Sequence, residues 1–261
     1  MRYLLIGYLL LAPATYSQTP APTVVRDPQA VSVLTQALNA AGGILAIAAV
    51  QDYTATGSVT YYWAGEEAPG TVVVKSRGAA QFRIDATMTA GVRSWAVSNG
   101  AGFLVNTDGT NSSIPATNTL NLGNMTLPVI YLAASLQDAN TGIAYVGLEA
   151  KNGSTVHHIQ LQKVFAPAVD PIGNLSGLTT RDVFIDSTSL LVLSTLDMFH
   201  PENQSAIDYP HEVQFSDFRL VNGILTPFAI AEFSSRQCTF AIQLSQINFN
   251  TGLQDLDFQQ N

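Results

Sequence analysis

Three Asn-Gly pairs, each lying between segments in which apolar and polar residues alternate, constrain this chain most strongly. They stand at Asn99-Gly100, Asn152-Gly153 and Asn222-Gly223. An Asn-Gly pair favours the two-residue turn that joins adjacent antiparallel strands, because both residues accept a positive φ. The three pairs therefore predict a chain built mainly from β-hairpins.

Apolar stripes with a period of two mark the strands of these hairpins. The clearest stripe begins at Cys238 and continues at every second position until Gln246, which interrupts the order and predicts a β-bulge. Such stripes either pack in a hydrophobic core or line a ligand cavity, and the spacing alone leaves both interpretations open. The members of the three main stripes are Val59, Tyr61 and Trp63; Phe82, Ile84 and Met88; and Phe240, Ile242 and Leu244.

Two helices are predicted beside these strands. Asp27 as N-cap and Pro28 in the first turn begin one helix, and Gly42-Gly43 ends it. A second helix is predicted over 127–136, with Pro128 in its first turn. Strongly twisted open sheets of more than about ten strands tend to curl or split. The predicted fold class is therefore mostly β (α+β), a large curled antiparallel sheet with helices covering its concave face.

Charge and cysteine content exclude several classes of function. The chain has 11 Lys and Arg against 19 Asp and Glu and no basic cluster, so the sequence predicts no nucleic-acid partner. Its single cysteine, Cys238, excludes an internal disulfide framework and a multi-cysteine metal site. Because Cys238 falls on the apolar face of its strand, it is predicted to be a buried, unreactive thiol.

The sequence carries no catalytic or cofactor-binding motif, so we expect neither an enzyme nor a cofactor. A G-x-S-x-G elbow, an H-E-x-x-H pair, a P-loop and a dinucleotide fingerprint are all missing. His157 and His158 point to opposite faces of one strand and cannot together bind one metal ion. Asp255 and Asp257 share a face of an extended segment, which would suit a general-acid pair or Ca²⁺, but a solvated tail is the favoured interpretation.

The first 17 residues have the pattern of a secretory signal peptide. Arg2 precedes a short apolar run, and small residues stand before a cleavage point at Gln18. The run is too short to cross a bilayer, which takes about 20 residues, and the alternative is an apolar N-terminal strand. We therefore expect export to the periplasm, a flexible linker over 18–26 and one domain over 27–261.

Four segments carry a resemblance to a known family. GTVVVKSRGAAQFRID (70–85) has a strand that ends in a basic residue, a kink and an aromatic strand, and VSNGAGFLVNTDG (97–109) has a polar turn into a second aromatic strand. SDFRLVNGILTPFAI (216–230) and INFNTGLQDLDF (247–258) form a matching C-terminal run. In this order the segments resemble the periplasmic lipoprotein-carrier superfamily, the LolA-like and outer-membrane lipoprotein-sorting proteins.

The resemblance implies an unclosed β-barrel, lined with apolar and aromatic side chains and capped by helices, that holds the acyl chains of a lipoprotein. Arg77 matches the family's basic residue whose hydrogen bonds to the helical lid keep the empty cavity closed. Ser76 is an additional residue before it, and Gly78 stands where the family has proline. The candidate ligand-binding residues are Arg77, Tyr61, Trp63, Phe82, Ile84, Met88, Phe240 and Ile242.

We therefore predict a monomeric periplasmic carrier or binding protein for a lipoprotein or another acylated or apolar ligand. A membrane-bound donor and a membrane-bound acceptor would be its partners. The alternative is a non-catalytic envelope sensor or protein-interaction module with the same fold. Co-purifying molecules would separate the two, because acyl species indicate a carrier and a stoichiometric protein indicates a module.

Overall fold

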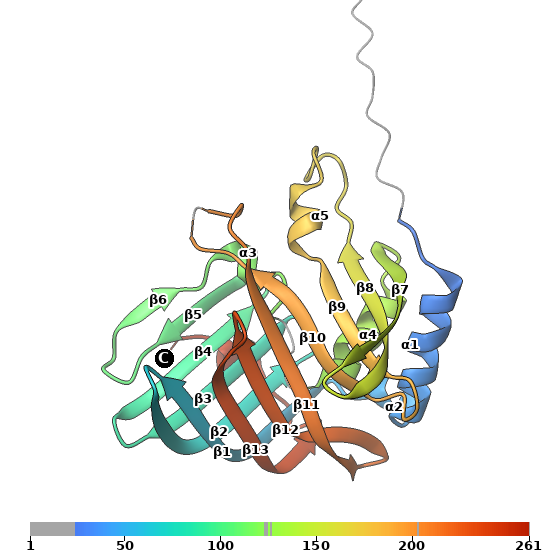
Figure 1. The fold of residues 1–261 in the computed structure, drawn as a ribbon. Coiled ribbons are helices and arrows are strands. Elements are labelled where there is room, and N and C mark those ends of the chain that lie inside the picture. Colours follow the sequence, from blue (N-terminus) through green and yellow to red (C-terminus); the bar gives the residue numbers. More distant parts are fainter. Residues whose placement is uncertain (1–23, 123–124, 126, 203, 261) are drawn as a thin grey trace, which may run out of the picture.

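The structure, a computed structural model, describes residues 24–122, 125, 127–202 and 204–260. In this part of the chain, thirteen strands form one antiparallel sheet in the order β6-β5-β4-β3-β2-β1-β13-β12-β11-β10-β9-β8-β7 (Figure 1). The sheet does not close on itself, because β6 and β7 form its two edges. The predicted mostly β, unclosed and curled sheet is confirmed. The predicted signal peptide lies outside the described residues.

Hairpins join most neighbouring strands, as the Asn-Gly pairs predict, and Asn99, Asn152 and Asn222 all have positive φ angles. The first half of the sheet holds β1 (Asp52–Trp63), β2 (Glu66–Arg77), β3 (Gln81–Met88), β4 (Gly91–Ser98), β5 (Ala101–Val105) and β6 (Asn111–Ser113). The second half holds β7 (Thr141–Lys151), β8 (Ser154–Lys163), β9 (Arg181–Asp186), β10 (Val192–Phe199), β11 (Tyr209–Val221), β12 (Ile224–Ser234) and β13 (Gln237–Phe249).

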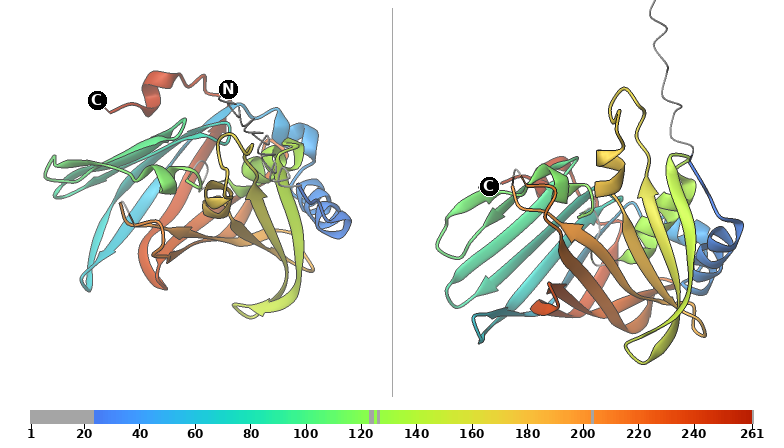
Figure 2. Two further views of the ribbon diagram at one scale, coloured as in Figure 1. Left: turned by 90° about the horizontal axis from the view of Figure 1, so that it is seen from above. Right: turned by 45° about the horizontal axis from the view of Figure 1, so that its top comes forward.

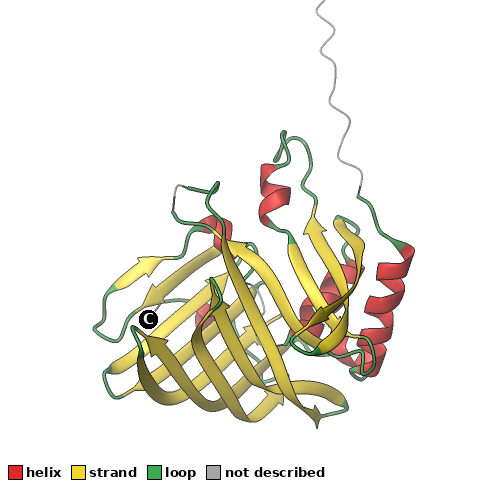
Figure 3. Cartoon of the chain, viewed as in Figure 1, coloured by secondary structure: helices red, strands yellow, loops and turns green. Residues whose placement is uncertain are grey.

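Short helices lie between and beside these strands (Figure 3). They are α1 (Pro28–Ala40), α2 (Ile44–Ala48), α3 (Ala116–Thr119), α4 (Pro128–Gln137), α5 (Asn174–Leu178) and the 3-10 helix η1 (Asp255–Phe258). The two predicted helices are confirmed as α1 and α4. The Asp27 carboxylate caps α1 by accepting hydrogen bonds from the amides of Gln29 and Ala30. The polar segment 108–122 contains β6 and α3.

Strands β1 and β13 pair at the centre of the sheet and join its two halves. Their register shifts between Thr56 and Gly57, so that Ser245 is the extra residue of a bulge one position before the predicted one. Gly57 is required at this point. A Cβ there would lie 2.2 Å from the carbonyl oxygen of Gln243 and 2.7 Å from the Cα of Leu244.

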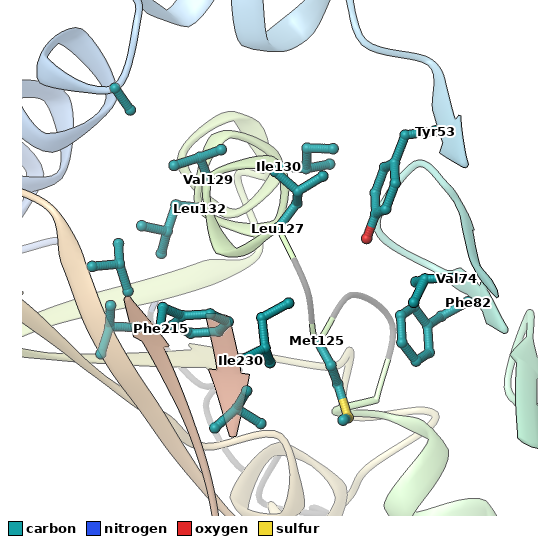
Figure 4. Packing of buried hydrophobic residues seen from close by; sticks show 14 of the residues in the cluster. Tyr53, Val74, Phe82, Met125, Leu127, Val129, Ile130, Leu132, Phe215 and Ile230 are labelled. Carbon is teal, nitrogen blue, oxygen red and sulfur yellow. The ribbon is translucent and has the colours of Figure 1, made fainter. Parts of the chain in front are cut away.

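Helix α4 fills one end of the concave face. Its buried side chains include Val129, Ile130 and Leu132, and Figure 4 shows them between Phe215 and Ile230 on one side and Tyr53 on the other. Helices α1 and α2 pack against α4, and α1 also contacts the edge strand β7. The two views in Figure 2 show these three helices together at the end of the molecule that holds β7. At the other end, the four-residue helix α3 contacts β5 and β10.

The outer face of β2–β4 is covered by the C-terminal segment 250–259, which follows β13. Lys75 forms an ion pair with Asp257 at 2.7 Å, and Arg83 donates hydrogen bonds to the carbonyl oxygens of Asp257 and Gln259. Helix η1 contacts β3 and β4, and its Phe258 is 2% exposed. The predicted solvated tail is therefore a packed strap, which crosses the sheet on the face opposite to the helices (Figure 2, left).

Candidate functional site

A cavity of about 450 Å³ lies at the end of the concave face that α4 leaves free. Its walls come from both halves of the sheet and from the segment that contains α3. Its lining includes six aromatic side chains: Tyr61, Tyr62, Trp63, Trp95, Phe199 and Phe240. Trp63 is 67% exposed and marks the rim of the cavity, whereas Tyr61 and Phe240 are buried.

Strand pairing positions the aromatic wall. Tyr61 on β1 lies directly opposite Phe240 on β13, and their ring centroids are 5.4 Å apart. The Trp95 ring on β4 lies 6.5 Å from Phe240 and 5.3 Å from Phe82, which stands behind it in the core. Tilted and edge-on ring contacts of this kind fix side-chain orientations. The wall is therefore a rigid apolar surface that comes from three strands.

Arg93 on β4 is the cation of this cavity. Its guanidinium lies 5.4 Å from the centroid of the Tyr61 ring and 5.7 Å from that of Trp63. One of its nitrogens donates a hydrogen bond of 2.7 Å to the side-chain oxygen of Asn106. Ring faces attract a cation and hold it in place. The charge therefore stands beside the rim of a chamber whose other lining side chains are mainly apolar.

A row of buried charges crosses four adjacent strands and ends at the cavity. Arg181 on β9 and Asp197 on β10 are 2.7 Å apart, and His211 Nδ1 on β11 lies 2.7 Å from the other oxygen of Asp197. His211 Nε2 is 3.3 Å from Glu232 Oε1 on β12, and the Thr239 hydroxyl donates to Glu232 Oε2 at 2.8 Å. Glu232 and Thr239 both line the cavity.

The charges in this row support one another. Burial lowers the pKa of His211, but the carboxylate of Asp197, together with Glu232, raises it to about 9. Burial also opposes ionisation of Asp197, yet Arg181 and His211 hold the pKa of that carboxyl below its usual range. His211 is therefore protonated at neutral pH. Its ring stacks on Phe199 at a centroid distance of 3.9 Å and forms the layer behind the cavity wall.

The Tyr61 hydroxyl is the other polar group in the aromatic wall. It makes no hydrogen bond to any described residue. Burial raises the pKa of Tyr61 to about 12, against the opposing effect of the nearby Arg93. The hydroxyl is therefore neutral at neutral pH and free to donate to a bound molecule.

The structure separates the predicted ligand-binding residues into two groups. Tyr61, Trp63 and Phe240 line the cavity. Phe82, Ile84 and Ile242 point to the same face of the sheet but are at most 2% exposed within the core, and Met88 packs against that core. The stripes on β1 and β13 therefore reach the cavity and the stripe on β3 lies in the core, while ligand binding by these residues stays a prediction.

Arg77 lies away from the cavity. Its neighbour Ser76 is fully buried on the concave face, so Arg77 projects from the opposite face of β2, together with Lys75. Arg77 donates hydrogen bonds to the side chain of Gln81, to the carbonyl oxygen of Leu253 and to the carboxylate of Asp255. The expected bonds to a helical lid are replaced by bonds to the C-terminal strap.

The structure also places the cysteine and two of the histidines that the sequence analysis considered. Cys238 is half-buried rather than buried, and burial raises its thiol pKa. His158 faces Asp182 at 2.9 Å and His157 faces the Tyr145 hydroxyl at 2.9 Å, on different sides of β8. Among the described residues, no three acidic, histidine or cysteine side chains group as metal ligands, and no helix is long and apolar enough to cross a membrane.

Sequence reasoning missed Arg93, Trp95 and Glu232. All three stand on the inward face of strands that the alternation identifies, but each is a single polar or aromatic residue in a short pattern. The pairing of β1 with β13 and of β13 with β12 brings Tyr61 near Glu232 and Thr239, which lie more than 100 positions away in the sequence. No local pattern carries that information.

The strand order, the helix-filled end and the apolar chamber at the other end together define a LolA-like half-barrel. An outer membrane lipoprotein-sorting protein domain from Vibrio parahaemolyticus superposes with a TM-score of 0.52 at 13% identity, over 88% of this chain and 96% of that one. A LolA superfamily protein from Nitrosomonas europaea gives a TM-score of 0.53 at 9% identity, over 88% and 98% of the two chains.

A DUF1329 family protein from Desulfovibrio piger has a TM-score of 0.50 at 11% identity, over 88% of this chain and 97% of its own. The predicted resemblance to the LolA-like fold is confirmed by these structures. No protein-family model matches the sequence, and no curated protein matches it. At such identities the likeness concerns the fold, and the site has to be interpreted from its own residues.

Proposed function

We propose that this protein is a carrier or binding protein for an acylated or otherwise apolar ligand, held in the cavity beside Tyr61, Trp95 and Phe240. The observation that carries the proposal is the cavity itself, about 450 Å³ in volume, whose mainly apolar lining includes six aromatic side chains. Ligand sites have volumes of about 300–1,000 Å³ and mainly apolar linings. Each buried CH₂ group contributes about 0.8 kcal/mol, so an acyl chain needs no further chemistry to be held there.

The fold supports this proposal. One similar structure is described as a lipoprotein-sorting domain and another as a LolA superfamily protein. In the proposal, the protein acts outside the cytoplasm after export, as a single domain over 27–261, and passes its ligand between membrane-bound partners. In this proposal its task is transfer rather than catalysis.

The first test fills the cavity. Leu104 on β5 lines the chamber, so Leu104→Trp should occupy the space that an acyl chain needs. Leu148→Trp is the matched control, because Leu148 is 59% exposed on the edge strand β7. The wild type and the control should bind a fluorescent fatty-acid probe saturably at about one site. Leu104→Trp should bind at least tenfold more weakly, about 1.4 kcal/mol.

Thermal unfolding of both variants verifies that they are folded. Absence of saturable probe binding to the folded wild type would remove the carrier proposal. In that case, a stoichiometric protein that co-purifies with the chain would favour the interaction module. Equal probe affinity for Leu104→Trp and the wild type would show that the ligand binds elsewhere on the molecule.

A further inference from the structure

The charges around the cavity do not balance. Glu232, the carboxylate of the lining, is already engaged by the Thr239 hydroxyl and by His211. Glu232 is the last member of the row formed by Arg181, Asp197, His211 and Glu232, and the charges of this row alternate in sign from strand to strand. With His211 protonated, as its raised pKa requires at neutral pH, the row contains two positive and two negative groups and has no net charge.

Arg93 stands outside this balance. Its neighbours are two ring faces and the neutral side chain of Asn106, and among the described residues no carboxylate lies within ion-pair distance of it. Most other cations have such a partner in the described part of the chain, Lys75, Arg77, Arg83, Lys151, Arg181 and Arg219 among them. In a chain of net charge −8, the cavity therefore carries an unpaired positive charge.

The position of Arg93 matters as much as its charge. It lies over the ring of Trp63, which is 67% exposed at the rim, and over the ring of Tyr61, which is 9% exposed inside. A molecule that lies along the aromatic wall with one end in the chamber would therefore place its other end beside the guanidinium. A guanidinium binds carboxylate and phosphate oxygens through paired N–H donors.

We propose that the occupant of the cavity is an anionic amphiphile, a single acyl chain whose carboxylate or phosphate head meets Arg93 at the rim. This inference rests on the proposed function and narrows its ligand class. The acyl chain contacts Trp95, Phe240 and the other apolar walls. Neutral and cationic amphiphiles of the same chain length are disfavoured, because they leave Arg93 without a counter-charge or place a second cation beside it.

The test compares ligands that differ only at the head group. Palmitate, its uncharged amide and the alkylammonium ion of equal chain length compete with a fluorescent acyl probe, each below its micellar concentration. A lysophosphatidate with the same chain distinguishes a phosphate head from a carboxylate. Trp63 and Trp95 are the two tryptophans of the sequence and both line the cavity, so intrinsic fluorescence reports binding a second way.

We expect the better of the two anionic ligands to bind about tenfold more tightly than the amide, the scale of one charge-assisted hydrogen bond. Arg93→Gln should abolish that preference, and Arg93→Lys should restore part of it. Arg219→Gln is the control, since it removes one exposed positive charge that is paired with Asp217, and it should keep the wild-type preference.

Equal binding of anion and amide by the wild type would overturn this inference and leave the carrier proposal standing. A preference that survives in Arg93→Gln would also overturn it, because the charge would then act from elsewhere. If none of the ligands binds to folded protein, the carrier proposal itself fails. Higher salt should weaken the anionic ligand alone, since screening acts on the head group and not on the chain.

Discussion

Single positions in this molecule owe their roles to the face of the strand on which they stand. Arg77 at the end of β2 and Arg93 near the start of β4 belong to the same half-sheet, yet Arg77 holds the C-terminal strap and Arg93 lines the cavity. Ser76 decides the difference, because it takes the buried position and turns Arg77 to the outer face. A match of residue type to a family pattern therefore does not settle which face a side chain reaches.

His211 should make stability depend on pH. Its pKa is about 9 in the folded protein against an ordinary value of 6.5, so folding favours its protonated form. The stabilisation is complete below pH 6.5 and is lost as the pH rises through 9, a decrease on the order of 3 kcal/mol. Urea unfolding at closely spaced pH values should show this fall in the wild type.

His211→Gln is the comparison for this experiment. The variant should be less stable than the wild type at pH 6.5 and should show a flatter profile between pH 6.5 and 9. If the free energies of unfolding of the two proteins change with pH in parallel, the protonated His211 ring does not contribute to stability through the charge row. The low pKa of Asp197 acts in the other direction, because its contribution disappears as the pH falls into the acid range.

Gly57 should tolerate no side chain. An added Cβ would meet backbone atoms of Gln243 and Leu244, which cannot move without opening the pairing of β1 and β13. Gly57→Ala should therefore lower the free energy of unfolding by about 1–3 kcal/mol. Gly177→Ala is the control, since a Cβ there meets nothing within 4 Å, and its urea midpoint should stay level or rise. Equal midpoints for both variants would contradict the close approach.

At the scale of elements, the sequence predicts those helices, strands and turns that depend on interactions between residues close together in the chain. The Asn-Gly turns, the alternation and the Asp27 cap give the hairpins, strands and first helix, because each depends on residues a few positions apart. The stripe through Val59, Tyr61 and Trp63 is continuous in sequence, but α4 covers only one end of the sheet. Core and cavity therefore share one pattern, and helix placement alone tells them apart.

The C-terminal strap should detach as a unit. Phe258 is buried against the outer face of the sheet, whereas Leu256 in the same 3-10 helix is 72% exposed. Phe258→Ala should raise hydrogen exchange and proteolysis of 250–259 while the central strands stay protected, because the strap adds to the sheet without being part of it. Leu256→Ala should behave as the wild type does.

Acyl-probe binding by Phe258→Ala is a second readout. It should be unchanged, since the strap and the cavity lie on opposite faces of the sheet. Loss of binding together with loss of the strap would contradict this separation and would tie Arg77 to the cavity after all. If the strap and the whole sheet unfold at the same denaturant concentration, the strap does not detach independently and this prediction is wrong.

At the scale of the whole molecule, the seam between β1 and β13 governs how the chain reaches its structure. Gln51 and Asn250, hydrogen-bonded at this seam, stand 199 positions apart in the sequence. Until β13 is present, β1 is an unprotected edge of a half-sheet, with backbone groups open to pairing with any other chain. We therefore expect folding to be slow, because it requires β1 to pair with the distant strand β13. Until that pairing forms, the half-sheet is exposed to aggregation.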